Sequence, residues 1–333
     1  MARITQEEMQ RVMEEKLAGR GVPADIAQDC AALLVENSLD GIYSHGVNRF
    51  PRLLRYLDQG YVKPDNRPQC VLSLGALEQW DGNLGMGNTN ARTCMDRAVQ
   101  LAKQHGIGAV ALRNTNHWMR GGSYGMQAAL AGCAGICWTN TQPNMPAWGT
   151  TEPCIGNNPL VLCVPRGKDD FVLCDGAMAQ FSYGAIEAAR LAGRMLPVPG
   201  GFDTEGNETR DPAEIEKTWR VMPIGYWKGS AFSVLMDMMA AGLSAGNTVG
   251  DVGRLSGDEF GLSQVFIALD VARLNPDNGG AVERIIADIK AAQPADSNVD
   301  VLYPGEKELR TRRDNLENGI PVEDAVWQEI AAL

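Results

Sequence analysis

The sequence has little positive charge for its length. Its 333 residues include 30 Lys and Arg against 41 Asp and Glu, which gives a formal net charge of -11 at pH 7. A negative surface repels polyphosphate, and the chain has no Lys- and Arg-rich run of the kind that binds nucleic acid. We therefore exclude a nucleic-acid partner. An anionic substrate would need a local arginine clamp, because the field of the whole molecule works against it.

Long apolar runs and paired cysteines are also missing. No run approaches the roughly 18 apolar residues that a membrane span requires, so we expect no membrane association. The eight cysteines form no Cys-x-x-Cys pair, and most of them lie in apolar stretches. Because the N-terminus also lacks a basic-then-apolar signal segment, the sequence predicts free, buried thiols in a reducing cytoplasm.

Signatures of metal and nucleotide binding are weak. The chain has three histidines, no His-Glu-x-x-His motif and no Cys/His cluster with ligand spacing, so we predict no metal site. The segment 85–90, Gly-Met-Gly-Asn-Thr-Asn, lacks the third glycine of the dinucleotide fingerprint, and no clear strand leads into it. These glycines are better explained by an ordinary turn and helix start.

The length suits two domains, or one domain with a large insertion. Residues 1–70 are predicted to be helical, beginning with a capping-box pair at Thr5 and Glu8, and helices return in 305–333. Between these segments, short β-branched runs alternate with helices, which indicates an α/β region. The simplest architecture packs both ends together as one helical domain, with 71–304 inserted as an α/β domain.

Within the α/β region and the C-terminal segment, the pattern predicts individual elements. The expected strands are 70–74, 108–112, 135–140, 160–164, 171–174 and 264–269. The expected helices are 89–105, 124–131, 181–191, 230–244, 281–292, 310–317 and 322–331. The segment 197–223 is rich in Gly, Pro, Asp and Glu and is too long for an idle connection, so we predict a functional loop there.

His45 lies at 43–50 in Tyr-Ser-His-Gly-Val-Asn-Arg-Phe, a polar junction between two predicted helices. A histidine in this place caps a helix or acts as a general acid/base near neutral pH, and the pattern favours neither. Arg49 offers a planar fork for a carboxylate, and a short helical turn can bring it to the same site as His45. His105 stands before a glycine at a helix end and is predicted to be structural.

His117 follows a predicted strand and precedes a predicted helix, within a run of polar residues. Polar residues that gather where a strand ends are typical of α/β active sites. The alternative is a loop histidine that bonds to backbone.

Two segments have the residue types of a cofactor site. The predicted strand that starts at Phe171 runs into Asp175-Gly176-Ala177, where backbone can approach a ribose or pyrophosphate, although a plain hairpin end explains it equally well. Trp227 and Lys228 place an aromatic ring and a cation at the start of an apolar helix. The alternative there is a capped helix.

At these segments the chain resembles the malate/L-lactate dehydrogenase type II oxidoreductase family. The motifs are YSHGVNRF at 43–50, NHWMRGGSYG at 116–125, GICWTN at 135–140, FSYG at 181–184, GGFD at 200–203 and GYWKGS at 225–230, followed by NGI and VW near the C-terminus. The resemblance implies a non-Rossmann α/β fold, a homodimer, and an inserted domain that binds NAD(P)H, with the active site in the cleft between the domains. It implies the NAD(P)H-dependent interconversion of a 2-keto acid and a 2-hydroxy acid.

Residue roles follow from the same motifs. His45 matches the family's proton donor, Ser44 and Arg49 would hold the substrate carboxylate, and His117 would lie beside the substrate and nicotinamide. The implied cofactor contacts are Phe171, Val172, Leu173, Cys174, Asp175, Gly176, Ala177, Trp227, Lys228, Gly305, Glu306 and Lys307.

The chain departs from its most similar subfamily on the cofactor side. That subfamily has Pro-Gly-His-Glu where this chain has Pro-Gly-Glu-Lys at 304–307, and Asp-Met-Ser where it has Asp-Gly-Ala at 175–177. The departures concern coenzyme choice and not the reaction. We expect NADH, while Arg166 and Lys168 leave NADP open because either side chain can pair with a 2'-phosphate.

Other substrates stay open at this point. The most similar subfamily acts on a sugar-derived keto acid, and we expect that class here, but the family also acts on malate, lactate, ureidoglycolate, sulfolactate and a cyclic imino acid. A catalytically silent anion-binding dimer would keep the same fold. The presence of Ser44, His45, Arg49 and His117 together favours an enzyme.

Overall fold

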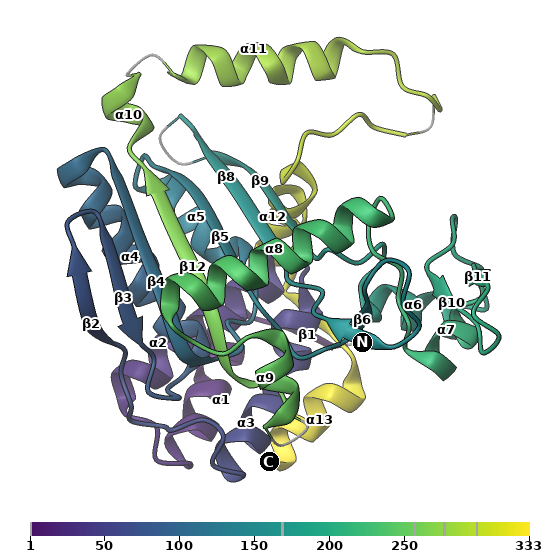
Figure 1. Cartoon of the computed structure of the whole chain (residues 1–333), viewed down its shortest axis with the longest axis horizontal. Helices are drawn as coiled ribbons and strands as arrows, with labels where there is room; N and C mark the ends of the chain where they lie inside the picture. Colours follow the sequence, from purple (N-terminus) through teal and green to yellow (C-terminus); the bar gives the residue numbers. More distant parts are fainter. Residues whose placement is uncertain (1, 168–169, 256–257, 276–277, 298) are drawn as a thin grey trace.

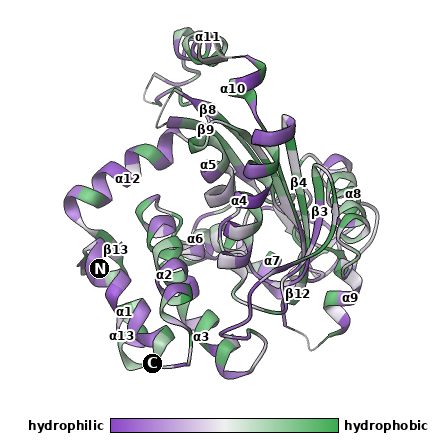
Figure 2. Ribbon diagram, turned by 90° about the vertical axis from the view of Figure 1, so that its left-hand side faces the viewer, coloured by the Kyte–Doolittle hydropathy of each residue, from purple (hydrophilic) through white to green (hydrophobic). Residues whose placement is uncertain are grey.

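The computed structural model describes residues 2–167, 170–255, 258–275, 278–297 and 299–333. Lys168, a candidate partner of a 2'-phosphate, lies outside the described residues. Among the helices within these ranges, none has the length and apolar character that a membrane crossing demands. Figure 2 shows helices from both ends of the chain on one side and the large sheet with its helices on the other.

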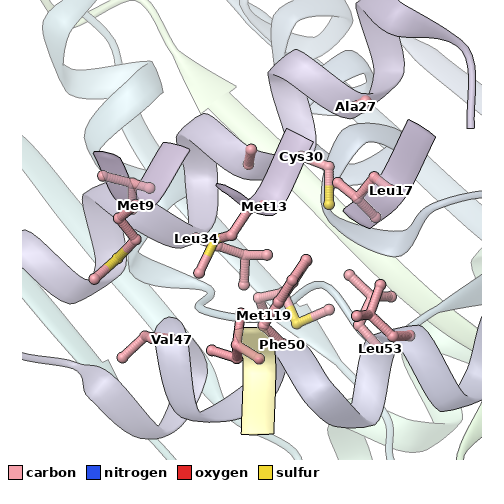
Figure 3. Close-up of a cluster of buried hydrophobic side chains, with 14 of the residues drawn as sticks. Met9, Met13, Leu17, Ala27, Cys30, Leu34, Val47, Phe50, Leu53 and Met119 are labelled. Carbon is pink, nitrogen blue, oxygen red and sulfur yellow. The ribbon is translucent and has the colours of Figure 1, made fainter. Parts of the chain in front are cut away.

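The two ends of the chain share one hydrophobic core. Their elements are β1 (Ala2–Ile4), α1 (Gln6–Ala18), α2 (Ala24–Leu39) and α3 (Phe50–Asp58) from the start, and α12 (Glu306–Asn318), β13 (Ile320–Val322) and α13 (Asp324–Ala332) from the end. Met9, Leu34 and Phe50 pack in the same buried cluster as Ile330, and Figure 3 shows the N-terminal side chains of this cluster around Met119.

The outermost strands were not predicted from the sequence. β1 pairs with β13 in antiparallel register, with Ala2 opposite Val322. The helix expected at 322–331 therefore begins at Asp324, because the preceding residues belong to β13. The N-cap predicted for α1 is confirmed, since Thr5 Oγ accepts a hydrogen bond from the backbone N of Glu8 at 3.2 Å.

The middle of the chain forms a seven-stranded mixed sheet, in the order β2-β3-β4-β12-β5-β8-β9. Its strands are β2 (Gln69–Leu74), β3 (Leu77–Asp81), β4 (Ile107–Asn116), β5 (Ala134–Thr139), β8 (Leu160–Arg166), β9 (Asp170–Gly176) and β12 (Phe260–Leu269). β3 and β4 are parallel, and the other neighbours in this sheet are antiparallel. The predicted α/β class is confirmed, and the directions differ from those of a doubly wound parallel sheet.

Helices cover both faces of the sheet. α4 (Gly87–His105) and α5 (Gly122–Leu130) pack on one face, in a core that includes Leu112, Trp118 and Phe266. α8 (Trp227–Ser244) crosses the other face, which is the near face in Figure 1, and packs Met236 and Ala240 there. Three further helices follow α8: α9 (Val249–Arg254), α10 (Val271–Leu274) and α11 (Asn278–Ala291).

The sequence-based account of the glycine segment 85–90 was wrong in one respect. A strand, β3, does precede it and ends at Asp81. The five residues of β3 include no β-branched residue, which is why the pattern missed them. β3, α4 and the parallel strand β4 form a crossover unit, and the segment turns the chain into α4. The predicted turn and helix start is thus confirmed.

The predicted loop at 197–223 is a folded lobe. It contains α7 (Pro212–Thr218) and a hairpin, β10 (Gly201–Phe202) with β11 (Glu208–Thr209), and it packs with α6 (Tyr183–Leu191) and a second hairpin, β6 (Met145–Pro146) with β7 (Pro153–Ile155). Ile186, Ile215 and Val221 form its core. The polar residues that suggested a loop are caps and turns: Asp211 Oδ1 accepts from the backbone N of Ala213 at 2.9 Å at the start of α7.

Candidate active site

The turn that carries His45 is held by the end of α2. Two 3-10 turns, η1 (Tyr43–His45) and η2 (Val47–Arg49), join α2 to α3. Asn37 Nδ2 donates to the carbonyl of His45 at 2.9 Å, and the backbone N of Val47 donates to Ser38 Oγ at 2.9 Å. A Cβ at Gly46 would lie 2.2 Å from Ser38 Oγ. The turn can therefore approach α2 this closely because residue 46 has no side chain.

His117 reaches the same place from the end of β4. The backbone N of Met119 donates to His117 Nδ1 at 3.0 Å, which leaves the hydrogen of the neutral ring on Nε2. The ring stacks on His45, with centroids 5.8 Å apart and planes at 23°. A Cβ at Gly87 would lie 2.3 Å from the carbonyl oxygens of Asn116 and His117, so the start of α4 packs directly on this backbone.

Ser44 and Arg49 lie beside the two rings. Ser44 Oγ is 3.0 Å from His45 Nδ1. Arg49 Nη2 donates to Glu259 Oε2 at 3.4 Å, and the same oxygen is 3.9 Å from His117 Nε2. The structure thus brings together the four residues that the sequence singled out for catalysis and substrate binding. Glu259 was missed, because a lone acidic residue 210 positions from Arg49 leaves no pattern.

A small pocket opens beside Arg49 and His117. It is lined by Arg49, Arg52, Leu53, Tyr56, Val62, Gly87, Asn116, His117 and Met119. Arg49 comes from η2, Arg52 comes from α3, and the polar wall comes from the end of β4. A carboxylate next to Arg49 would therefore lie close to both imidazoles.

Burial favours the neutral form of both histidines of the site in the free protein. Burial lowers the pKa of His45 to about 4, and the positive charges of Arg49 and Arg120 add to the effect. Burial also lowers the pKa of His117 well below its ordinary value, followed by the charges of Arg49, His45 and Arg52. A neutral His45 can accept a proton, and it needs a nearby anion to hold one.

A charge cluster centred on the buried pair of Arg120 and Asp40 lies between His117 and the end of β9. Arg120, which is 3% exposed, forms an ion pair with Asp40, and its Nε is 3.9 Å from Asp175 Oδ2. Asp40 also accepts from Arg312 Nη1 at 2.8 Å. Burial raises the pKa of Asp175, while Arg120 and the backbone N of Gly122, which donates to it at 2.7 Å, oppose the rise. The cluster ties α2, the loop after β4, β9 and α12 to one another.

The three segments predicted to bind the cofactor meet around the end of β9. The backbone N of Leu173 donates to the carbonyl of Pro304 at 3.1 Å, which sets 305–307 beside β9. The backbone N of Ile224 donates to the carbonyl of Met178 at 2.8 Å, which sets the start of α8 beside the residues after β9. Segments far apart in the sequence are thus neighbours here.

The side chains of these segments are unequally available to a ligand. Phe171 and Leu173 are buried in the core, so they can offer only backbone groups. The Asp175 carboxylate is engaged with Arg120, and the Glu306 carboxylate is held by Lys290, by Arg310 and by the backbone N of Tyr303. Trp227 is 59% exposed. The remaining predicted contacts lie on the same segments: Val172, Cys174, Gly176, Ala177, Lys228, Gly305 and Lys307.

Arg166, the described candidate for a 2'-phosphate contact, already has partners. It donates to both carboxylate oxygens of Glu283, at 2.6 and 3.1 Å, and to Tyr303 Oη at 2.8 Å. A 2'-phosphate would have to displace Glu283 to use this guanidinium.

Comparison with known proteins gives a consistent result. The family model for malate/L-lactate dehydrogenase matches residues 4–331. Proteins named 2,3-diketo-L-gulonate reductase are 49% identical in Citrobacter koseri and 47% identical in Escherichia coli, over 99% of this chain and the full length of each relative. Sulfolactate dehydrogenase from Methanocaldococcus jannaschii is 27% identical with a TM-score of 0.91, over 99% of this chain and 95% of that one. Malate dehydrogenase from Pyrococcus horikoshii is 26% identical with a TM-score of 0.89, over the same shares.

The family match covers nearly the whole chain, and the relatives named reductase match it from end to end. The likeness in fold to the two dehydrogenases extends over both the end-derived helices and the sheet. The chain therefore belongs to the malate/L-lactate dehydrogenase family of oxidoreductases, which implies a nicotinamide coenzyme and a small keto or hydroxy acid as substrate.

Proposed function

We propose that the protein reduces 2,3-diketo-L-gulonate to 3-keto-L-gulonate, with NADH as coenzyme and His45 as the proton donor. The observation that carries this proposal is that Arg49 and His117 line one pocket and that His45 stacks on His117 beside it. The choice of substrate is supported by the full-length relatives named 2,3-diketo-L-gulonate reductase. The helical domain is 1–70 with 305–333, the inserted α/β domain is 71–304, and the site lies in the cleft between them.

The residues at the end of β9 fit a nicotinamide coenzyme. A Cβ at Gly176 would meet no atom within 4 Å, so the space above this turn is free for a ligand. Gly305 has φ +91°, and a Cβ there would lie 3.1 Å from the backbone N of Leu173, so glycine lets the start of α12 lie close to β9. Trp227 offers an exposed ring for stacking. When bound, the coenzyme supplies the hydride for the C2 carbonyl.

The side chains at the pocket fit the binding of the substrate carboxylate and the donation of a proton to the C2 oxygen. Arg49 uses one donor on Glu259, which leaves the rest of its planar fork for the substrate carboxylate and so fixes the face of C2 that is presented. The Nε2 hydrogen of His117 can donate to the C2 oxygen, and protonated His45 donates the proton that the new hydroxyl requires. Because an anion beside His45 favours the imidazolium, the substrate raises the pKa of His45 as it binds.

The rate of keto-acid reduction is expected to fall with rising pH. A pKa of about 4 for His45 in the free protein means that its protonated fraction drops about tenfold per pH unit above that value. Since kcat/KM reports the free enzyme, log kcat/KM for reduction should decline with a slope of about -1 between roughly pH 5.5 and 8. Oxidation of the hydroxy acid, which needs neutral His45, should show no such decline. A flat reduction profile up to pH 7 would contradict this assignment.

A panel of 2-keto acids, assayed by oxidation of NADH and of NADPH, tests the substrate and the coenzyme together. We expect the highest kcat/KM with 2,3-diketo-L-gulonate and NADH. NADPH should be the poorer coenzyme, because the Glu283 carboxylate that holds Arg166 repels a 2'-phosphate. A higher kcat/KM with the keto acids of malate, lactate, ureidoglycolate or sulfolactate, or with a cyclic imino acid, would replace the proposed substrate.

The protein works as a cytoplasmic homodimer in this proposal, and the outer face of α8 supports the dimer. α8 buries Ser233, Met236 and Ala240 against the molecule, yet Phe232, Leu235, Met238 and Met239 on its other side are exposed. A helix that is apolar on both faces is typically buried on both faces. In this proposal the sheet packs against one face of α8, and a second copy of the chain packs against the other.

Replacing Leu235 with glutamate is expected to shift the protein from dimer to monomer, because the change sets a charge in the middle of the exposed apolar face of α8. Light scattering coupled to size exclusion measures the mass directly. Leu316→Glu is the matched control, since Leu316 is also exposed but lies on α12. An unchanged dimer in Leu235→Glu would place the interface elsewhere.

A further inference from the structure

The two arginines that line the pocket are each paired with an acidic residue from behind the lining. Arg49 pairs with Glu259 at 3.4 Å, and Arg52 lies 4.0 Å from Asp258. Arg49 ends η2 and Arg52 follows it in the first turn of α3, and the two acids are consecutive residues just before β12. With both histidines neutral, the formal charges of these four groups cancel before a substrate arrives. A single carboxylate then brings the site to one negative charge, and a second acidic group would bring it to two.

The second arginine is already bonded. Arg52 donates to Tyr56 Oη from Nε at 3.2 Å and from Nη2 at 2.7 Å, and Tyr56 Oη donates to Asp258 Oδ1 at 3.1 Å. A substrate with a second acidic group would need Arg52 as its partner, and it would have to break this chain of contacts. It would also meet the charge of Asp258 at close range.

The same pocket has one buried hydrogen-bond acceptor without a donor among the described residues, the side-chain oxygen of Asn116. Asn116 is buried, and its Nδ2 donates to the carbonyls of Leu84 and Gly85 at 2.9 Å each, which fixes the orientation of the amide. Its Oδ1 accepts no hydrogen bond from the described residues, although Asn116 lines the pocket. A buried acceptor of this kind is costly unless a ligand donates to it, and substrate hydroxyl groups are donors.

We infer that Asp258 and Glu259 determine substrate specificity: they neutralise Arg52 and Arg49 and thereby select a 2-keto acid with one carboxylate and an uncharged, hydroxylated tail over a dicarboxylic or sulfonated keto acid. The inference rests on the proposed function, because it assigns the substrate carboxylate to Arg49. It adds to the proposed function a physical basis for selectivity, in which residues of this chain favour binding of a polyhydroxy keto acid with one carboxylate over a dianion.

The experiment compares oxaloacetate, a dianion, with pyruvate, a monoanion of similar size, in the full-length protein. Asp258→Asn keeps the shape and an acceptor for Tyr56 but removes the charge, so the ratio of kcat/KM for oxaloacetate to that for pyruvate should rise about fivefold or more. Asp258→Glu restores the charge, and its ratio should return toward that of the unaltered protein. Asp58→Asn is the matched control: Asp58 is the last residue of α3 and pairs with Arg20 at 2.9 Å, so the ratio should stay constant.

Binding of inhibitors separates this inference from the proposed function. Oxamate is a monoanionic and tartronate a dianionic analogue, and titration calorimetry gives a Kd for each with NADH present. If no keto acid is reduced, the proposed function fails, yet the ratio of the two Kd values still reports selection: a shift toward tartronate in Asp258→Asn supports the inference. An unchanged ratio in Asp258→Asn, or an equal change in Asp58→Asn, overturns it, whatever the turnover.

Discussion

Replacing His45 with alanine is expected to lower kcat for keto-acid reduction by about 10² to 10⁴-fold, the usual contribution of a general acid. The Kd for NADH should stay unchanged, because the segments predicted to bind the coenzyme lie at the end of β9 and at the starts of α8 and α12. Steady-state kinetics with a fluorescence titration of NADH measures both quantities. The pH dependence of kcat/KM that arises from His45 should also disappear.

His105 supplies the matched control for this substitution. It is the exposed last residue of α4, next to Gly106 at φ +87°, where it was predicted to be structural. His105→Ala should therefore retain the activity of the unaltered protein. The role given to His45 would be wrong if His45→Ala kept near-normal turnover, or if both variants lost activity to the same extent.

Replacing Arg120 with methionine is expected to destabilise the protein by about 3 kcal/mol, the lower end of the cost of breaking a buried ion pair, because buried Asp40 keeps Arg312 and Asp175 is partly exposed. Arg120 contacts both Asp40 and Asp175, and its side chain is almost fully buried. Urea unfolding gives the change in free energy. Because Arg120 is one of the charges that lower the pKa of His45, the pH profile of the surviving activity should move to higher pH.

Two further variants test whether the loss comes from unpaired buried charge. Arg312→Met removes the other partner of Asp40, but the Arg312 side chain is 33% exposed, so the loss should be smaller. Adding Asp40→Asn to Arg120→Met should recover part of the stability, because the buried Asp40 charge, left with Arg312 alone, is then gone. Strictly additive losses in this cycle would mean that the Arg120 and Asp40 side chains do not interact.

The sequence predicted the fold best where elements are long and strongly patterned. α4, α5 and α8, and the strands at the sheet centre, lie within a few residues of their expected places. β3 was not predicted because its residues have weak strand propensity, and tertiary contacts stabilise the strand instead. It pairs with β4, and its buried Glu78 forms an ion pair with Arg97 at 2.8 Å. Nothing local reveals the pairing of β1 with β13 either, because neither three-residue strand is stable without the other.

The site was predicted by motif and not by geometry. Local sequence patterns indicated that His45, Arg49 and His117 could take part in catalysis or substrate binding. Their closeness in space depends on how η1 packs against the end of β4, which no local pattern predicts. Arg120 stood inside a recognised motif, and its partner Asp40 stood at a helix end; neither gave a sign of the buried pair that they form. No sequence pattern around Asp258 and Glu259 indicated a role in the site. The two residues precede β12, and only the folded structure places them beside Arg52 and Arg49.

The pairing of the two chain ends also sets an order for assembly on the ribosome. Arg3 lies opposite Pro321, so translation at about 5 to 20 residues per second leaves β1 waiting roughly 15 to 60 s for its partner strand. Through that interval the apolar faces of α1 and α2 lack the contribution of Ile320, Val322 and Ile330. The nascent sheet can collapse first, whereas the core behind the His45 turn closes last. A ribosome that stalls before residue 320 would thus hold a chain with every proposed catalytic side chain synthesised and no finished site.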